Sequence, residues 1–136
     1  MRNMTIKKED KRRIDSFEMK CYRDILNIRW YHRITNEDVI NRIQPTIRIW
    51  QMVMKRKLGL FGHICRMEDK RLVKTACLGM VEGTRNRGRP RRAWIDDIKE
   101  WTGLRIGEIV RIASNRGEWR KCICTTVDTN GQAHGV

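Results

Sequence analysis

Apolar residues in this chain recur every three or four positions, and charged residues occupy most of the positions between them. The pattern extends from residue 11 to residue 124 with one main interruption, and it does not turn into the strict alternation of a half-buried strand. Spacings of three and four place side chains on one face of a helix. The sequence therefore predicts an all-α fold.

Two amphipathic helices are expected near the N-terminus. The first covers residues 11–29, with an apolar face of Ile14, Phe17, Cys21, Ile25 and Ile28. Thr35 is a favourable N-cap for the second, which Pro45 ends. Asp38 stands at the third helical position, and Ile34 and Val39 occupy the two positions of a hydrophobic staple.

A third helical segment covers residues 46–67. Its apolar face contains Trp50, Val53, Met54, Leu58, Phe61 and Cys65. Lys55 and Arg56 fall on the opposite face. Gly59 and Gly62 weaken the helix by roughly 1 kcal/mol each relative to alanine.

Residues 68–90 interrupt the helical pattern with glycines and arginines. Helical signals then resume, with Pro90 suited to a first turn, Gly103 to a C-cap, and Asn115 to an N-cap. The sequence thus predicts two small helical units, residues 1–67 and 91–124, joined by an irregular basic linker, residues 68–90. The polar residues 125–136 are expected to form a disordered tail.

The chain has a strong positive charge, with 30 Lys and Arg against 16 Asp and Glu, a formal net charge of +14. Such a surplus attracts polyanions, and the candidates are nucleic acid or an anionic membrane face. No apolar run approaches the roughly 20 residues that span a bilayer, so no membrane partner is expected. The N-terminal residues lack the apolar region of a secretory signal, and the scattered cysteines, as reduced thiols, indicate a nuclear or cytoplasmic protein.

The five cysteines are scattered and odd in number, which favours reduced thiols. Zinc is the alternative, but no pair has C-x₂-C spacing, and Cys122-x-Cys124 is too close for the usual geometry. We therefore expect no metal, no cofactor and no small-molecule substrate. The sequence leaves the oligomeric state open.

A run of arginines precedes Trp94, and it has two interpretations. Around Gly88 and Pro90 it resembles the core of an AT-hook, in which an extended chain enters a narrow minor groove. It is also compatible with a solvated linker in which Pro90 opens a helix. Phosphate contact that is independent of base sequence requires only the charge.

The sequence therefore predicts a nucleic-acid-binding surface in two segments: Arg85, Arg87, Gly88, Arg89, Arg91 and Arg92 in the linker, and Lys55, Arg56 and Lys57 in the third helix. Trp94, Trp101 and Trp119 could stack on bases. Their helical spacing on apolar faces instead favours a place in the core.

Several strings in a fixed order resemble a known family. They are Phe17-Glu18-Met19, Cys21-Tyr22-Arg23, Trp30, Thr35-Asn36-Glu37, Lys55-Arg56-Lys57-Leu58, Gly62-His63, Arg66-Met67, Glu82-Gly83, Arg87-Gly88-Arg89-Pro90, Trp94, Asp96-Asp97, Trp101-Thr102-Gly103, Arg116 and Trp119-Arg120. The chain resembles the C-terminal region of non-LTR (LINE-type) retrotransposon reverse transcriptases, downstream of the polymerase core. The resemblance implies a parent polypeptide with an endonuclease and an RNA-directed DNA polymerase.

This chain is not expected to be an enzyme. Asp96 and Asp97 superficially imitate the paired aspartates of a polymerase palm, but they share a helical period with Ile98 and Trp101. We interpret both as surface residues in the first turn of a helix, where negative charge is favourable. The resemblance implies a non-catalytic region that holds RNA template or target DNA. The alternatives are a structural or protein-interaction domain, or an unselected remnant of a transposable element.

Overall fold

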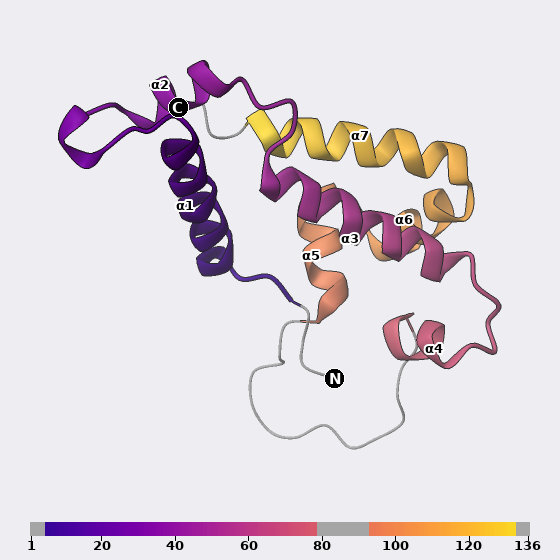
Figure 1. Cartoon of the computed structure of the whole chain (residues 1–136). Helices are drawn as coiled ribbons and strands as arrows, with labels where there is room; N and C mark the ends of the chain where they lie inside the picture. Colours follow the sequence, from indigo (N-terminus) through magenta and orange to yellow (C-terminus); the bar gives the residue numbers. More distant parts are fainter. Residues whose placement is uncertain (1–4, 79–92, 133–136) are drawn as a thin grey trace. The chain divides into compact units, whose positions relative to one another are not determined.

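The structure, a computed structural model, describes residues 5–78 and 93–132 (Figure 1). Within these two stretches there is no strand, and the all-α prediction is confirmed. The elements are α1 Lys8–Ile25, the 3₁₀ turn η1 Trp30–His32, α2 Asn36–Ile43, α3 Ile49–Cys65, α4 Leu72–Leu78, α5 Trp94–Thr102, α6 Ile106–Ser114 and α7 Arg116–Gln132.

The described chain divides into two compact units at a place that the sequence did not indicate. The N-terminal unit comprises residues 6–53, and the C-terminal unit begins at Met54. The boundary thus falls inside α3 and not at residues 68–90. The reason is that Met54, Leu58 and Phe61 are fully buried and belong to the core of the C-terminal unit.

In the N-terminal unit, α1 packs against α2. Thr35 caps α2 as predicted, because its Oγ1 accepts a hydrogen bond from the Asp38 N–H at 3.2 Å. The helix ends at Gln44, which has a left-handed backbone (φ 48°) just before Pro45. Val39, on the inner face of α2, is completely buried.

The expected inner face of α1 is wrong at two positions. Phe17 is 60% exposed and Ile25 is 74% exposed, whereas Glu18 and Met19 are buried. Successive residues of a helix point about 100° apart, so Phe17 lies about 200° from Met19, and a helix that turns Glu18 and Met19 inward directs Phe17 outward. Two partners of Glu18, Arg48 and Ile49, lie about 30 residues further along the chain, beyond the reach of a local pattern.

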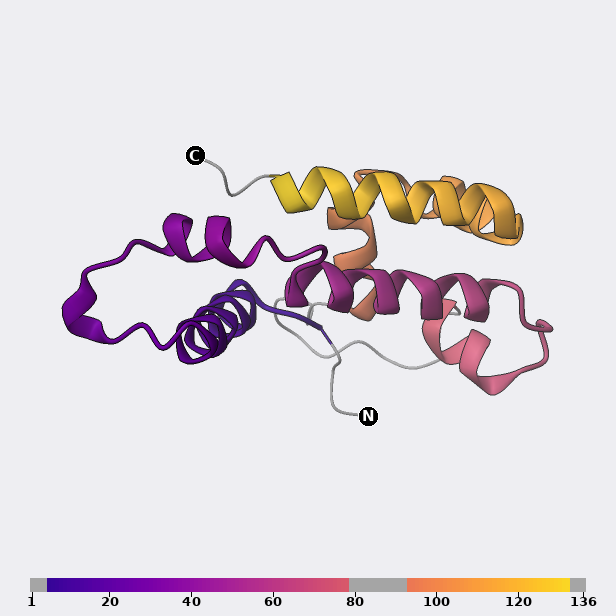
Figure 2. The same cartoon turned by 45° about the horizontal axis from the view of Figure 1, so that its top comes forward.

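In the C-terminal unit, α3 and α7 lie side by side (Figure 1 and Figure 2), and α5 and α6 both contact α7. The apolar core consists of Met54, Leu58, Phe61, Ile64, Cys65, Ile98, Ile109, Ala113, Trp119, Ile123 and Val127. Burying a side chain of the size of leucine or phenylalanine contributes about 1.5–3 kcal/mol relative to leaving it exposed. These contacts hold together helices that are short on their own.

The predicted ends of α5 and α7 are confirmed at their caps. Gly103 ends α5 with a left-handed backbone, φ 68°. The Oδ1 of Asn115 accepts hydrogen bonds from the backbone N–H of Gly117, at 3.0 Å, and of Glu118, at 3.5 Å. Both residues act through their immediate neighbours, which is why the sequence alone revealed them.

Two segments expected to be irregular are helical. The tail predicted to be disordered from residue 125 continues α7 through Gln132, because Thr126 and Val127 are buried and Asn130 donates a hydrogen bond to the Trp101 carbonyl at 3.3 Å. Within residues 68–90, α4 forms a short helix. Residues 79–92 and 133–136 lie outside the described residues.

Candidate nucleic-acid interface

The basic tripeptide of α3 has two exposed residues and one buried residue. Lys55 and Arg56 are exposed, in keeping with the prediction of a surface position. Lys57 is 9% exposed. It stands three residues after Met54 and four before Phe61, so the helical period places it on the core face.

Lys57 forms a buried ion pair with Asp97 of α5. The ammonium Nζ contacts Asp97 Oδ2, and the side chains are 8% and 0% exposed. The same Nζ lies 5.5 Å from the ring centroid of Trp94 and 5.4 Å from that of Trp101. A cation over indole faces is stabilised by the negative charge density of the rings, more so where water is excluded.

The expectation that Asp97 lies on the surface is therefore wrong. Its neighbour Asp96 does behave as predicted, because Asp96 Oδ2 accepts a hydrogen bond from the Ala93 N–H at 2.7 Å and caps α5. Asp97 is one position further around the helix, where it meets Lys57. The ion pair fastens the first turn of α5 to the middle of α3.

Of the three tryptophans of this unit, Trp119 belongs to the core, as its spacing favoured, and Trp94 and Trp101 lie at the edge of the core. The Phe61 ring lies between two of them, 5.9 Å from Trp94 and 5.6 Å from Trp119 between centroids. Trp119 is 2% exposed, and its Nε1–H donates to the Leu58 carbonyl at 2.9 Å. Trp94 and Trp101 are half-buried against Lys57. Their indoles thus line the ion pair, which disfavours a base-stacking surface here.

The two glycines of α3 differ in what surrounds them. A Cβ on Gly62 would stand 2.3 Å from two ring atoms of Trp119. A Cβ on Gly59 would meet no atom within 4 Å. Gly62 therefore allows the backbone of α3 to lie directly against the indole of Trp119, and Gly59 has no such role.

The predicted contact residues Arg85, Arg87, Gly88, Arg89, Arg91 and Arg92 all lie outside the described residues. The structure does describe the helices on either side of them. The last described residue before them, Leu78, ends α4, Ala93 after them is the N-cap of α5, and α4 contacts α5. Both ends of the arginine-bearing segment are thus attached to the C-terminal unit.

The described residues show no arrangement suited to metal chemistry. In residues 5–78 and 93–132, no group of three or more His, Cys, Asp or Glu side chains is placed to hold a metal ion. The five cysteines are free thiols. Burial raises the pKa of the Cys65 thiol to about 11, so it stays protonated and unreactive at neutral pH.

One exposed feature was missed by the sequence reasoning. Residues 29–33, Arg-Trp-Tyr-His-Arg, form the loop around η1, and all five side chains are exposed. We call this segment the aromatic tip. The signal that could have revealed it is the pair of arginines on either side of three consecutive rings.

No family model, curated protein or solved structure matches the chain. Among the helices that the structure describes, none combines the length and the apolar character that crossing a bilayer requires. Charge, exposure and geometry of the chain's own residues therefore carry the functional conclusion.

Proposed function

We propose that this chain binds RNA or DNA through phosphate contacts and catalyses no reaction, like the reverse-transcriptase C-terminal region that its sequence resembles. The observation that supports this is the disposition of its surplus positive charge. The net charge is +14, and the basic residues that α3 shows to solvent are Lys55 and Arg56. The one buried cation among the described residues, Lys57, is paired with Asp97.

In this proposal the two predicted basic segments have different tasks. Lys55 and Arg56 supply cations on a rigid helix, and Arg85 to Arg92 supply cations on the segment between α4 and α5. Neutralising phosphates releases condensed counterions, which drives binding without reading bases. Lys57 would act indirectly, by holding α5 against α3 and so fixing the end of the arginine segment.

The experiment measures binding of the full chain to fluorescein-labelled RNA and DNA duplexes by anisotropy at several salt concentrations. Affinities should be roughly micromolar or weaker, the range of non-specific binding. With three to five phosphate contacts, the slope of log K against log salt on duplex DNA should be about −3 to −5. Arg87→Ala with Arg89→Ala should make the slope shallower by about 2 on all sequences alike.

A matched control removes the same charge elsewhere. Lys7 and Lys8 lie at the N-terminus of α1, where positive charge opposes the helix dipole, so replacing both with alanine leaves the helix intact. This double variant should keep the full slope. Binding that does not depend on salt, or an equal loss in both double variants, would contradict the proposal. A loss confined to AT-rich duplex would favour the minor-groove interpretation.

A protein-interaction role is the second candidate, and the exposure of Phe17 and Ile25 on α1 favours it. Exposed apolar side chains that form a contiguous patch mark a docking face. The same titrations separate the two candidates. Phe17→Ser and Ile25→Ser leave all basic residues in place, so they should leave nucleic-acid affinity unchanged.

A further inference from the structure

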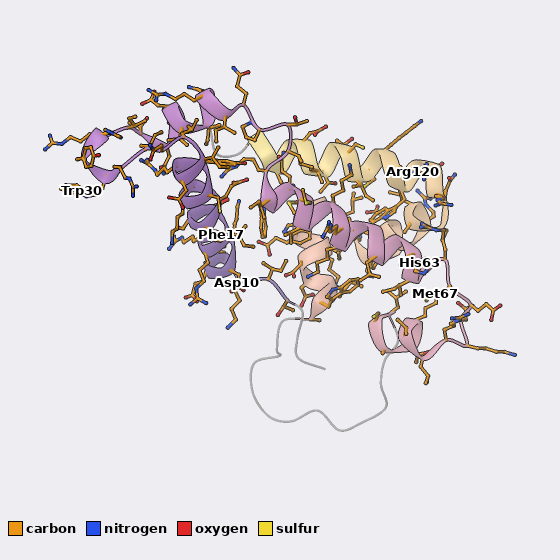
Figure 3. The ribbon with its side chains drawn as sticks, in the orientation of Figure 1. Asp10, Phe17, Trp30, His63, Met67 and Arg120 are labelled. Atoms are coloured by element: carbon orange, nitrogen blue, oxygen red, sulfur yellow. The ribbon has the colours of Figure 1, made fainter. Side chains whose placement is uncertain are left out.

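The aromatic tip presents the most exposed ring in the N-terminal unit. Trp30 is 90% exposed and Tyr31 is 60% exposed. Figure 3 shows Trp30 at the end of the loop between α1 and α2, pointing away from both helices. Leaving an indole in water forgoes the largest apolar burial that any side chain offers. The exposed Trp30 indole is therefore a candidate contact for a binding partner.

The tip is a folded loop. The Ile28 N–H donates to the Arg23 carbonyl at 2.8 Å, and Ile28 itself is buried. Arg23 Nη2 donates to the Ile34 carbonyl at 2.8 Å, which fastens the other end of the loop. Inside the loop, the Arg29 N–H donates to His32 Nδ1 at 3.0 Å.

The backbone of the loop turns at two residues. Asn27 and Arg33 adopt left-handed backbones, φ 52° and 49°, which reverse the chain around the rings.

The rings touch one another by their edges. Trp30 and Tyr31 have centroids 5.9 Å apart and planes at 81°, and Tyr31 and His32 have centroids 4.5 Å apart and planes at 68°. Edge-to-face contact of this kind leaves broad ring surface uncovered, in agreement with the exposure of Trp30. The indole is therefore available to a flat ligand.

The charge around the rings selects the class of ligand. Arg29 and Arg33 are exposed on either side of the aromatic residues, and residues 25–36 contain no Asp or Glu. A flat π face between two cations complements a chain that alternates flat bases with phosphates. A duplex hides its base faces in the stack, so only an unpaired nucleotide offers both features.

We propose that the aromatic tip is a stacking site for an unpaired base, with Trp30 against the base and Arg29 and Arg33 on the flanking phosphates. The proposal rests on the nucleic-acid binding proposed above and adds a preference for single strands. It concerns residues of the N-terminal unit, whereas the phosphate contacts proposed above belong to the C-terminal unit.

The test uses the full chain with labelled oligo(dT), oligo(U) and a blunt DNA duplex. Trp30→Ala should weaken single-strand binding roughly 5- to 100-fold, because one base stack contributes that much, and should leave duplex binding unchanged. Its salt slope should stay the same, since no charge is lost. Arg29→Ala with Arg33→Ala should instead reduce the single-strand slope by about 1.4.

Two variants serve as controls. Trp30→Phe keeps a ring and should retain most of the affinity. Phe17→Ala removes another exposed aromatic side chain from the same unit and should have no effect. Circular dichroism should be identical for all variants, because none of the replaced side chains is buried.

The possible failures are distinguishable. If the wild-type chain binds duplex and single strands but Trp30→Ala changes neither, the stacking site is refuted and the proposed function stands. If the wild-type chain binds neither, both proposals fail. If Trp30→Ala abolishes binding to phosphatidylserine-containing vesicles and leaves oligo(dT) binding intact, the tip is a membrane contact and the stacking proposal is wrong.

Discussion

Among the described residues, each of the two units encloses one carboxylate completely, but the two carboxylates have different hydrogen-bond and ion-pair partners. In the N-terminal unit, Glu18 accepts hydrogen bonds from Arg48 Nε at 2.8 Å, from the Ile49 N–H at 2.8 Å and from the Tyr22 hydroxyl at 3.0 Å. In the C-terminal unit, Asp97 pairs with the ammonium of Lys57. Both acidic side chains are 0% exposed.

The partners of Glu18 place it at the start of α3. Ile49 is the first residue of that helix, so Glu18 caps it from a distant part of the chain and also meets the positive end of its dipole. Tyr22 remains a donor over a wide pH range, because burial, together with Glu18 as hydrogen-bond acceptor and nearby negative charge, raises its pKa to about 12. The Arg48 side chain is 22% exposed, so water can reach this pair.

Lys57 is more enclosed than Arg48, at 8% exposure between two indoles. A buried charge that loses its partner is left without water to replace it. Both units contain a pair of one carboxylate and one cation. We expect the loss of one member of the pair to lower the free energy of unfolding less in the N-terminal unit than in the C-terminal unit.

The largest effect is expected at Lys57. Lys57→Met removes the ammonium that lies against the enclosed carboxylate of Asp97, so the free energy of unfolding should fall by about 3–5 kcal/mol in urea denaturation. Adding Asp97→Leu should restore much of that loss, because the pair is then replaced by apolar groups. Lys55→Met, two residues away and exposed, should change stability by less than about 0.5 kcal/mol. Equal effects of Lys57→Met and Lys55→Met would show that the pair contributes nothing.

A smaller effect should come from the packing of the C-terminal unit alone. Gly62→Ala forces the indole of Trp119 away from α3 and should cost about 2–3 kcal/mol. Gly59→Ala, in the same helix but in open space, should instead stabilise the protein by about 0.5–1 kcal/mol through helix propensity. Thermal denaturation of the two variants side by side measures this difference, and shifts of the same sign would refute the role of Gly62.

The smallest of the three effects is expected at Glu18. Glu18→Gln keeps an oxygen acceptor for the Ile49 N–H, and Arg48 recovers water, so we expect a loss of only about 1.5 kcal/mol. Glu9→Gln, on the exposed side of α1, is the matched control and should cost no more than about 0.5 kcal/mol. A loss at Glu18 as large as that at Lys57 would remove the contrast between the two units.

The features that the sequence predicted well are those that depend on neighbouring residues. Helical hydrogen bonds join residues four apart, and the caps at Thr35, Gly103 and Asn115 act within three positions. The exposure of Lys55 and Arg56 followed from the same period. The place of Lys57 on the core face could have been found too, from its spacing to Met54 and Phe61, if its charge had not suggested a surface position.

The sequence by itself determined that the chain is helical and strongly basic, where α2 begins and ends, where α5 ends, and where α7 begins. Only the tertiary structure decided which side chains are buried. Glu18 is buried and its neighbour Phe17 is exposed, and Asp97 is buried together with Lys57. Trp119 packs against Gly62, whereas Trp30 is exposed to water. Helix formation depends on contacts within one turn. Burial of a charge here depends on a partner 30 or 40 residues away. The amino-acid pattern around either partner does not show that the two residues will pair.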